Sequence, residues 1–144
     1  DLFTKEAEKV PPGADNLIFL PFLTGERAPN WNPSMRACFV GLGLHHGKAQ
    51  IIRSVMEGVM CRMKAVMELF KPLLPEKVEV VASGGYVESK LWLKIQANLF
   101  NLPILVPEEK EAATLGAIII ALFAMGKITS LESFEPQIKK EILP

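Results

Sequence analysis

A strand pattern, two adjacent glycines and a helix pattern follow one another within Val78-Glu79-Val80-Val81-Ala82-Ser83-Gly84-Gly85-Tyr86-Val87-Glu88-Ser89-Lys90-Leu91-Trp92. The β-branched run at 78–81 predicts a short buried strand. Apolar residues then recur at four-residue spacing at Leu91, Ile95 and Leu99, which predicts a helix. Ser89 stands just before this helix, where an N-cap residue is expected. This order predicts an α/β unit whose glycine turn lies at the carboxyl edge of a sheet.

Gly84 and Gly85 form the turn between this strand and this helix. Open α/β sheets bind ligands at the carboxyl ends of their strands, and the N-termini of helices favour anions. Glycine also lets a ligand come close to the backbone, because it has no Cβ atom. The glycine pair is therefore a candidate ligand site, and the alternative is a tight connection between a strand and a helix.

The composition is that of a globular chain with a hydrophobic core. The 144 residues suffice for one domain, and 49% of them are hydrophobic. The 16 basic residues balance the 16 acidic ones, which argues against nucleic acid or a membrane surface as a partner. The Cys and His residues do not have the spacing of metal ligands, so we expect no metal site of the protein's own.

Targeting signals and cysteine usage predict the compartment. No signal peptide is recognisable, and the longest apolar run, 115–125, is too short to span a bilayer. Cys38 and Cys61 have apolar neighbours, which predicts buried, reduced thiols. We therefore expect a cytoplasmic protein.

The first residues suggest that the chain is a fragment. It does not begin with Met, and the short polar segment 1–9 precedes Pro11-Pro12-Gly13. We expect these residues to be the tail of an earlier element and a linker.

Two apolar runs, 17–23 and 37–42, predict strands that pair in an antiparallel manner, and the first of them is expected to be buried. The loop between them, 24–33, carries Glu26, Arg27 and Trp31 among prolines, and such charged, aromatic loops often have a function. Glu26 and Arg27 are therefore candidate site residues. The alternative is a surface loop in which Arg27 pairs locally and Trp31 covers the core.

A long helix is predicted from about Lys48 to Lys71, because apolar residues recur there with a period of 3.6. Arg53 and Glu57 are four residues apart and are expected to pair on one face. Gly58 lies in mid-helix, where it lowers helix stability, so we expect it to permit the close approach of another backbone.

The rest of the chain predicts one more strand, 102–106, and one more helix, 112–125. The strands at 78–81 and 102–106 are connected through a helix and should be parallel. The helix 112–125 is apolar nearly all round and should be buried on most sides, and Gly126 should end it. The polar segment 127–144 is expected to be a loosely packed tail.

These residues together resemble the carboxy-terminal domain of the FGGY carbohydrate kinases, over residues 13–134. The motifs that carry the resemblance are Gly25-Glu26-Arg27-Ala28-Pro29-Asn30-Trp31-Asn32-Pro33 with Arg36, Gly41-Leu42, His46, Ile52-Arg53, Glu57-Gly58, Ala82-Ser83-Gly84-Gly85, Ser89, Trp92, Glu111 and Leu115-Gly116-Ala117. The segment 26–32 is most similar to gluconate kinases, and next to xylulose kinases. Two positions depart from the family: Ala37 replaces a usual Gly, and Tyr86 replaces a frequent Gly or Ala.

The resemblance implies an α/β, actin-like and ribonuclease-H-like ATPase domain with a mixed sheet flanked by helices. It implies an enzyme that transfers the γ-phosphate of ATP, with Mg2+, to a sugar or sugar acid. Gly84, Gly85 and Tyr86 would line the adenosine end of the nucleotide through their backbone, and Ser89 would contact the adenine. The catalytic base, the phosphate loop and most sugar contacts would lie in an upstream domain, so we expect no catalytic residue in residues 1–144. Mg2+ would be held mainly by the phosphates and that upstream domain.

Two classes of function are thus open. The first is the nucleotide-side part of an ATP-dependent carbohydrate kinase, whose partners would be its own upstream domain and its substrates. The second is a non-catalytic α/β subunit-interaction module, because the apolar helix 112–125 could pack on a partner. An unpaired sheet edge would also allow a homodimer.

Overall fold

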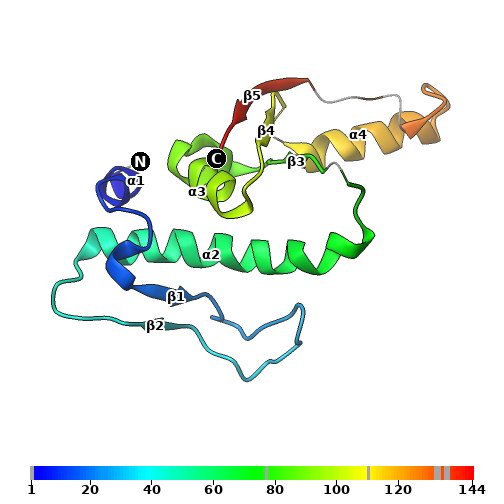
Figure 1. Cartoon of the computed structure of the whole chain (residues 1–144). Helices are drawn as coiled ribbons and strands as arrows, with labels where there is room; N and C mark the ends of the chain where they lie inside the picture. The colour runs from blue at the N-terminus through cyan, green and yellow to red at the C-terminus, as the bar shows by residue number, and fades with distance from the viewer. Residues whose placement is uncertain (1, 77, 110, 132–133, 135–136) are drawn as a thin grey trace. The chain divides into compact units, whose positions relative to one another are not determined.

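The computed structural model describes residues 2–76, 78–109, 111–131, 134 and 137–144. The chain forms two compact units, Asp1–Val78 and Glu79–Pro144, and each unit is described by itself. Figure 1 labels the elements, which are α1 (Leu2–Glu8), β1 (Ile18–Leu20), β2 (Cys38–Val40), α2 (Lys48–Phe70), β3 (Val80–Val81), α3 (Lys90–Phe100), β4 (Ile104–Pro107), α4 (Ala112–Ala124) and β5 (Ile138–Ile142).

In the first unit, β1 and β2 form the predicted antiparallel pair, in which Phe19 lies opposite Phe39. Only one face of this hairpin is covered. Phe19 is 9% exposed, whereas its strand neighbour Ile18 is 56% exposed, because successive side chains of a strand point to opposite faces. The predicted burial of the run 17–23 is therefore wrong for the face that carries Ile18 and Leu20.

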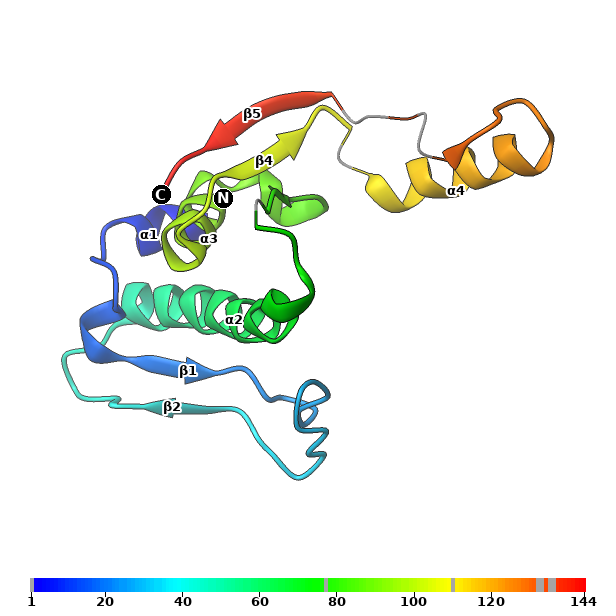
Figure 2. The same ribbon diagram turned by 45° about the vertical axis from the view of Figure 1, so that its right-hand side comes forward.

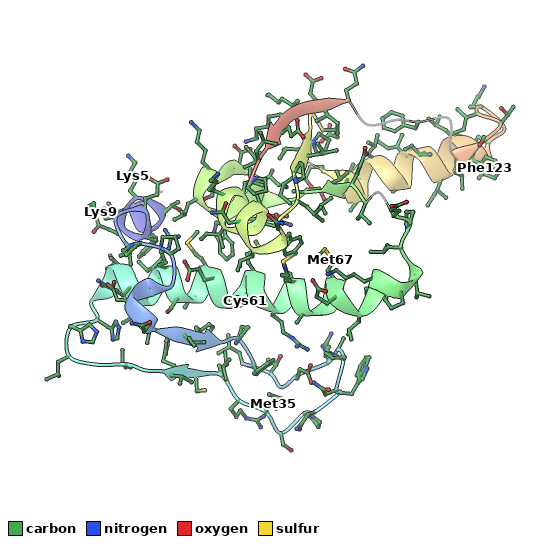
Figure 3. All side chains as sticks on the ribbon, viewed as in Figure 1. Lys5, Lys9, Met35, Cys61, Met67 and Phe123 are labelled. Carbon is green, nitrogen blue, oxygen red and sulfur yellow. The ribbon has the colours of Figure 1, made fainter. Side chains whose placement is uncertain are left out.

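The cysteines are also more exposed than predicted. Cys38 is on β2 and Cys61 is on α2, where Figure 3 labels it, and both thiols are free and exposed. Desolvation of the sulfur and the nearby Glu57 carboxylate raise the pKa of Cys61. This thiol is therefore less easily ionised than an ordinary cysteine.

The helix α2 runs beside β1 and ends one residue before its predicted end (Figure 1). Within α2, Met56 and Met60 are buried, with 3% and 2% of their surface exposed, whereas Met63 is 41% exposed. Gly58 lies where α2 meets β1, and a Cβ atom there would be 2.2 Å from the backbone oxygen of Phe19. The predicted close approach of a second backbone is thus confirmed.

A largely buried ion pair on α2 also binds the backbone near the start of the chain. The predicted pair between Arg53 and Glu57 is confirmed, with 2.6 Å between Nε and Oε1. The guanidinium also donates to the backbone oxygen of Ala7 (3.4 Å), and the Glu57 carboxylate accepts from the backbone N–H of Gly13 (3.0 Å). Ala7 is fully buried. The described residues of segment 1–13, which we expected to be a tail and a linker, are therefore a packed part of the first unit.

In the second unit, the strands lie in the order β3–β4–β5, and β3 and β4 are parallel as predicted. The strand β5 pairs with β4 in an antiparallel manner, so that Ile142 lies opposite Ile104 and Lys140 opposite Val106. The sheet is mixed, as expected. However, the predicted loose packing of segment 127–144 is wrong for Ile138–Ile142, because these residues satisfy the free edge of β4 with a ladder of backbone hydrogen bonds.

The core of this unit lies between α3 and the sheet. Leu93 and Ala97 of α3 and Ile104 of β4 are fully buried, and Ile95 is 3% exposed. The predicted helix is thus confirmed, with its apolar face turned inward. The strand β3 is shorter and more exposed than predicted, since Val81 is 50% exposed and β3 is an edge strand of this sheet.

The helix α4 differs most from its prediction. It ends before Gly126, which has a φ of 67°, as expected, but none of its residues is buried. Figure 2 shows α4 extending away from the three strands, and Figure 3 shows Phe123 on its outer part. The predicted burial is wrong because no other described helix or strand of the second unit packs extensively against α4. None of the helices in the described part of the chain has the length and apolarity needed to cross a membrane.

Candidate functional site

The glycine turn follows the carboxyl end of β3, as predicted. The backbone N–H of Ala82 donates to the oxygen of Leu105 on β4 (2.8 Å) and continues the pairing of the two strands by one residue. Gly84 then adopts φ 89° and ψ −179°, and Gly85–Glu88 form a short 3-10 turn that leads into α3. The backbone of the turn is therefore held at the edge where parallel strands end.

The two glycines differ in their backbone conformation. The conformation of Gly84 is one that only glycine adopts readily, so a tight connection explains this residue. Gly85 has no such φ, and a Cβ atom at either position would meet nothing within 4 Å. Packing among the described residues thus gives no reason for a glycine at Gly85, and the space over the turn is open to a ligand.

The side chain of Tyr86 is turned toward α3. Its hydroxyl donates to Oε1 of Gln96 (3.0 Å), and its ring lies edge-on to Trp92, with 6.4 Å between the ring centroids. Burial raises the pKa of Tyr86, so the hydroxyl stays protonated at neutral pH. Because the side chain of Tyr86 contacts α3, it does not fill the open side of the turn. The backbone of Tyr86 can therefore face a ligand there.

Ser89 is the N-cap of α3, which confirms one of its two predicted roles. Its Oγ accepts from the backbone N–H of Trp92 (3.3 Å). The bond satisfies a backbone donor that the first turn of a helix leaves without a partner. The contact of Ser89 with a ligand remains a prediction.

Two substitutions separate the predicted roles of Ser89. Ser89→Ala removes the cap and should lower the free energy of unfolding by about 1 kcal/mol, whereas Ser89→Asn keeps a capping oxygen. Thermal melting checks this difference. If ligand affinity is the same in the wild-type, Ala and Asn forms, Ser89 is a cap and has no contact with the ligand.

A cavity of about 550 Å³ lies beside the turn, between the ends of β3 and β4 and the first half of α4. Its walls are mostly apolar, with polar groups at Ser83, Glu108, Glu109 and Gln137. The described residues that line it are Val81, Ser83, Pro107, Glu108, Glu109, Ala112, Leu115, Gly116, Ile119, Phe134 and Gln137. Its size and lining are typical of a small-molecule site. Ser83 directly precedes Gly84, so the cavity and the glycine turn are continuous along the chain.

Sequence reasoning missed most of this cavity. Glu108 could have been predicted, because the ends of two parallel strands share one edge. Phe134 and Gln137 could not, since they come from the segment expected to be loose. The oxygen of Gln137 accepts from the backbone N–H of Glu108 (2.8 Å), so the pairing of β5 with β4 brings them to the cavity.

The other candidate residues, Glu26 and Arg27, belong to the loop of the first unit. Glu26 is 5% exposed, and its carboxylate accepts from Arg62 of α2 and from the backbone N–H of Asn30 (3.2 Å). Arg62 also donates to the backbone oxygen of Ala28. Desolvation raises the pKa of Glu26, but the hydrogen bonds from Arg62 and Asn30 together lower it by more. The pKa therefore lies below its ordinary value of 4.5. Glu26 is therefore the internal support of this loop.

Arg27 and Trp31 point outward from the supported loop. Arg27 is exposed, and Trp31 is 72% exposed, so the alternative in which Trp31 covers the core is wrong. The ion pair of the loop joins Glu26 to Arg62, 36 residues away. The loop is thus held by Glu26 and Arg62 and exposes an arginine and an indole. Its functional role remains a prediction.

The described residues do not form a metal site of their own. Nowhere in that part of the chain do three His, Cys, Asp or Glu side chains gather closely enough to hold an ion. Glu108 and Glu109 are the only carboxylates among the described residues that line the cavity. Any ion at this site would therefore need further ligands, such as the phosphates of a nucleotide.

Comparison with known proteins gives one consistent result. The model of the FGGY family of carbohydrate kinases, C-terminal domain, matches residues 1–125. A gluconokinase of Bacillus subtilis is 39% identical over 139 residues, which are 96% of this chain and 27% of the relative.

Two crystal structures from Lactobacillus acidophilus are similar over almost the whole chain. The structure of a gluconate kinase has a TM-score of 0.85 at 35% identity and covers 99% of this chain, which spans 29% of that protein. The structure of a ligand-bound xylulose kinase has a TM-score of 0.86 at 35% identity, with the same coverage of 99% and 29%. The chain thus spans less than a third of the length of the relatives that it matches.

Proposed function

This chain belongs to the FGGY family of carbohydrate kinases, and we propose that it forms the nucleotide-side part of an ATP-dependent sugar or sugar-acid kinase. Its fold is the expected actin-like fold with a mixed sheet, since it superposes on kinases of this family with TM-scores of 0.85 and 0.86. The chain spans 27% of the gluconokinase that it resembles. We propose that the domain is incomplete at its amino-terminal side and that an upstream domain completes the enzyme.

The observation that carries this proposal is the open glycine turn at the end of β3. A Cβ atom at Gly84 or Gly85 would meet no other atom within 4 Å, and the cavity begins at the neighbouring Ser83. In our proposal the adenosine end of ATP lies against the backbone of Gly84, Gly85 and Tyr86. Ser89, which is already oriented by its bond to Trp92, would contact the adenine.

The reaction would transfer the γ-phosphoryl group of ATP to a carbohydrate hydroxyl. The hydroxyl oxygen forms a bond to the γ-phosphorus, the bond to the β-phosphate oxygen breaks, ADP leaves, and a base accepts the hydroxyl proton. Such transfer depends on positioned phosphates, a metal ion and a base. We assign the base and the phosphate loop to the upstream domain, and the ligands of Mg2+ to that domain and the phosphates.

Gluconate is the first proposed substrate and xylulose the second. The similarity to gluconokinase, at 39% identity, supports this order. The alternative of a non-catalytic interaction module gains no support from the comparisons. We further propose a cytoplasmic location. We also propose that the protein could form a homodimer, because an exposed strand edge can pair with a second copy of the chain.

Activity of the complete protein that contains this chain tests the proposal. With ATP and magnesium it should phosphorylate gluconate faster than xylulose, as measured by coupled detection of ADP. Residues 1–144 alone should show no turnover and should bind AMP and ATP weakly and about equally, because only the adenosine end is held. Turnover by the chain alone that is lost on substitution of Glu26 or Glu111 would show that the catalytic groups lie here and would contradict the proposal.

A further inference from the structure

The last strand of the chain reaches the glycine turn. β5 lies beyond residues 1–125, which the family model matches. Within β5, Lys140 lies opposite Val106 of β4, and its Nζ donates to the backbone oxygen of Val87 (3.4 Å). Val87 is 2% exposed and belongs to the 3-10 turn that starts at Gly85. A charged group from the end of the chain is thus bonded to the backbone of the candidate site.

This bond is one of several that hold the turn. At its start, Ala82 is bonded to Leu105 of β4 (2.8 Å). Within it, the N–H of Val87 donates to the oxygen of Gly84 (3.2 Å). At its end, the oxygen of Val87 accepts from Lys140. The bond from β5 therefore attaches the end of the turn to a different strand from the one that holds its start.

The same segment of the chain also builds part of the cavity. Phe134 and Gln137 line it, and Gln137 is bonded through its backbone to Glu108 (2.8 Å). Figure 2 shows β5 along β4, with α3 near the start of β4. The turn and one wall of the cavity thus depend on one strand, although they are far apart in the sequence.

We propose that Lys140 is a positioning residue for the nucleotide, because it fixes the glycine turn in the geometry that presents the backbone of Gly84 and Gly85. Lys140 does not touch the nucleotide in this proposal. A site that is held in its binding geometry loses less conformational freedom when the ligand binds, so loss of the bond should weaken nucleotide binding. The inference rests on the proposed function and assigns to β5 a role in it.

Lys140→Met in the complete protein tests this role, since methionine keeps most of the apolar stem and removes the donor. KM for ATP should rise about three- to tenfold, which is less than the loss of a direct hydrogen bond to a charged group would give, because Lys140 acts on the nucleotide only through the turn. kcat and KM for the sugar should stay unchanged. Lys140→Arg, which restores a positive donor, should recover most of the wild-type KM for ATP.

Two matched variants control for the loss of a lysine. Lys139→Met removes the neighbouring exposed lysine of the same strand. Lys94→Met removes another bond from a lysine to a backbone oxygen, that of Leu143 (3.1 Å), which does not involve the turn. Neither variant should change KM for ATP. Melting temperatures of all variants should be measured in parallel, so that a general loss of stability is recognised.

The outcomes distinguish this inference from the proposed function. If Lys140→Met has the KM for ATP of the wild type, or if Lys94→Met raises it equally, the positioning role is wrong and the kinase assignment is unaffected. If the wild-type protein neither binds nor uses ATP, the proposed function itself is wrong. A rise confined to Lys140→Met and reversed by Lys140→Arg supports the inference.

Discussion

Gly85→Val weakens the binding of ATP and AMP about tenfold or more and changes the melting temperature little. The substitution is tolerated by the fold, because a Cβ atom at this position meets nothing within 4 Å and the backbone is outside the left-handed region. The valine side chain would occupy the space in which we place the nucleotide, and overpacking of a site typically costs about 1–3 kcal/mol. Nucleotide titration and thermal melting of the complete protein measure the two effects.

Gly84→Ala is the control for this experiment. Gly84 also has open space around it, but its φ of 89° with ψ −179° is unfavourable for any residue with a Cβ atom. This variant should therefore lower the free energy of unfolding by about 1–3 kcal/mol. Unchanged nucleotide affinity in Gly85→Val would contradict the site assignment. A large fall in its melting temperature would favour a tight connection with no ligand.

Gly58→Ala destabilises the first unit, although alanine favours helices more than glycine does. Its Cβ atom would be 2.2 Å from the oxygen and 3.3 Å from the Cβ atom of Phe19, so β1 would have to move away from α2. We expect a loss of about 3 kcal/mol or more in the free energy of unfolding, which exceeds the gain of about 1 kcal/mol from helix propensity. Urea denaturation with circular dichroism measures this loss.

The matched control is Gly116→Ala, at the other mid-helix glycine of the described chain. A Cβ atom at Gly116 meets nothing within 4 Å, so only the helix propensity changes. The free energy of unfolding should stay the same or rise by up to about 1 kcal/mol. Equal effects of the two substitutions would show that α2 and β1 do not pack as closely at Gly58 as the structure indicates.

The parts of the fold that depend on neighbours in the sequence were predictable. The turn at Gly84 and the cap at Ser89 follow from local backbone and hydrogen-bonding preferences, which a few residues determine. The pair of Arg53 and Glu57 follows from the spacing of side chains on a helix. The parallel arrangement of β3 and β4 follows from the helix that connects them. In the first three cases the interacting groups are close in the sequence. In the last case the connecting helix allows only one relative direction of the two strands.

The parts that depend on distant neighbours were decided by tertiary structure. Local pattern could not show that Glu26 pairs with Arg62 on α2 and that Arg27 stays exposed, because both arginines are equally suitable partners for a carboxylate. For the same reason the apolar pattern of α4 predicted burial without determining which surface would cover it.

The polar residues around Lys140 predicted a loose segment. Their strand β5 forms because the edge of β4 is free and its backbone groups need partners. Hydrophobic pattern and charge indicate which side chains favour burial and which favour solvent. Only the packed chain determines which distant segment covers or pairs with them. The support of the glycine turn by Lys140 is therefore a property of the tertiary structure.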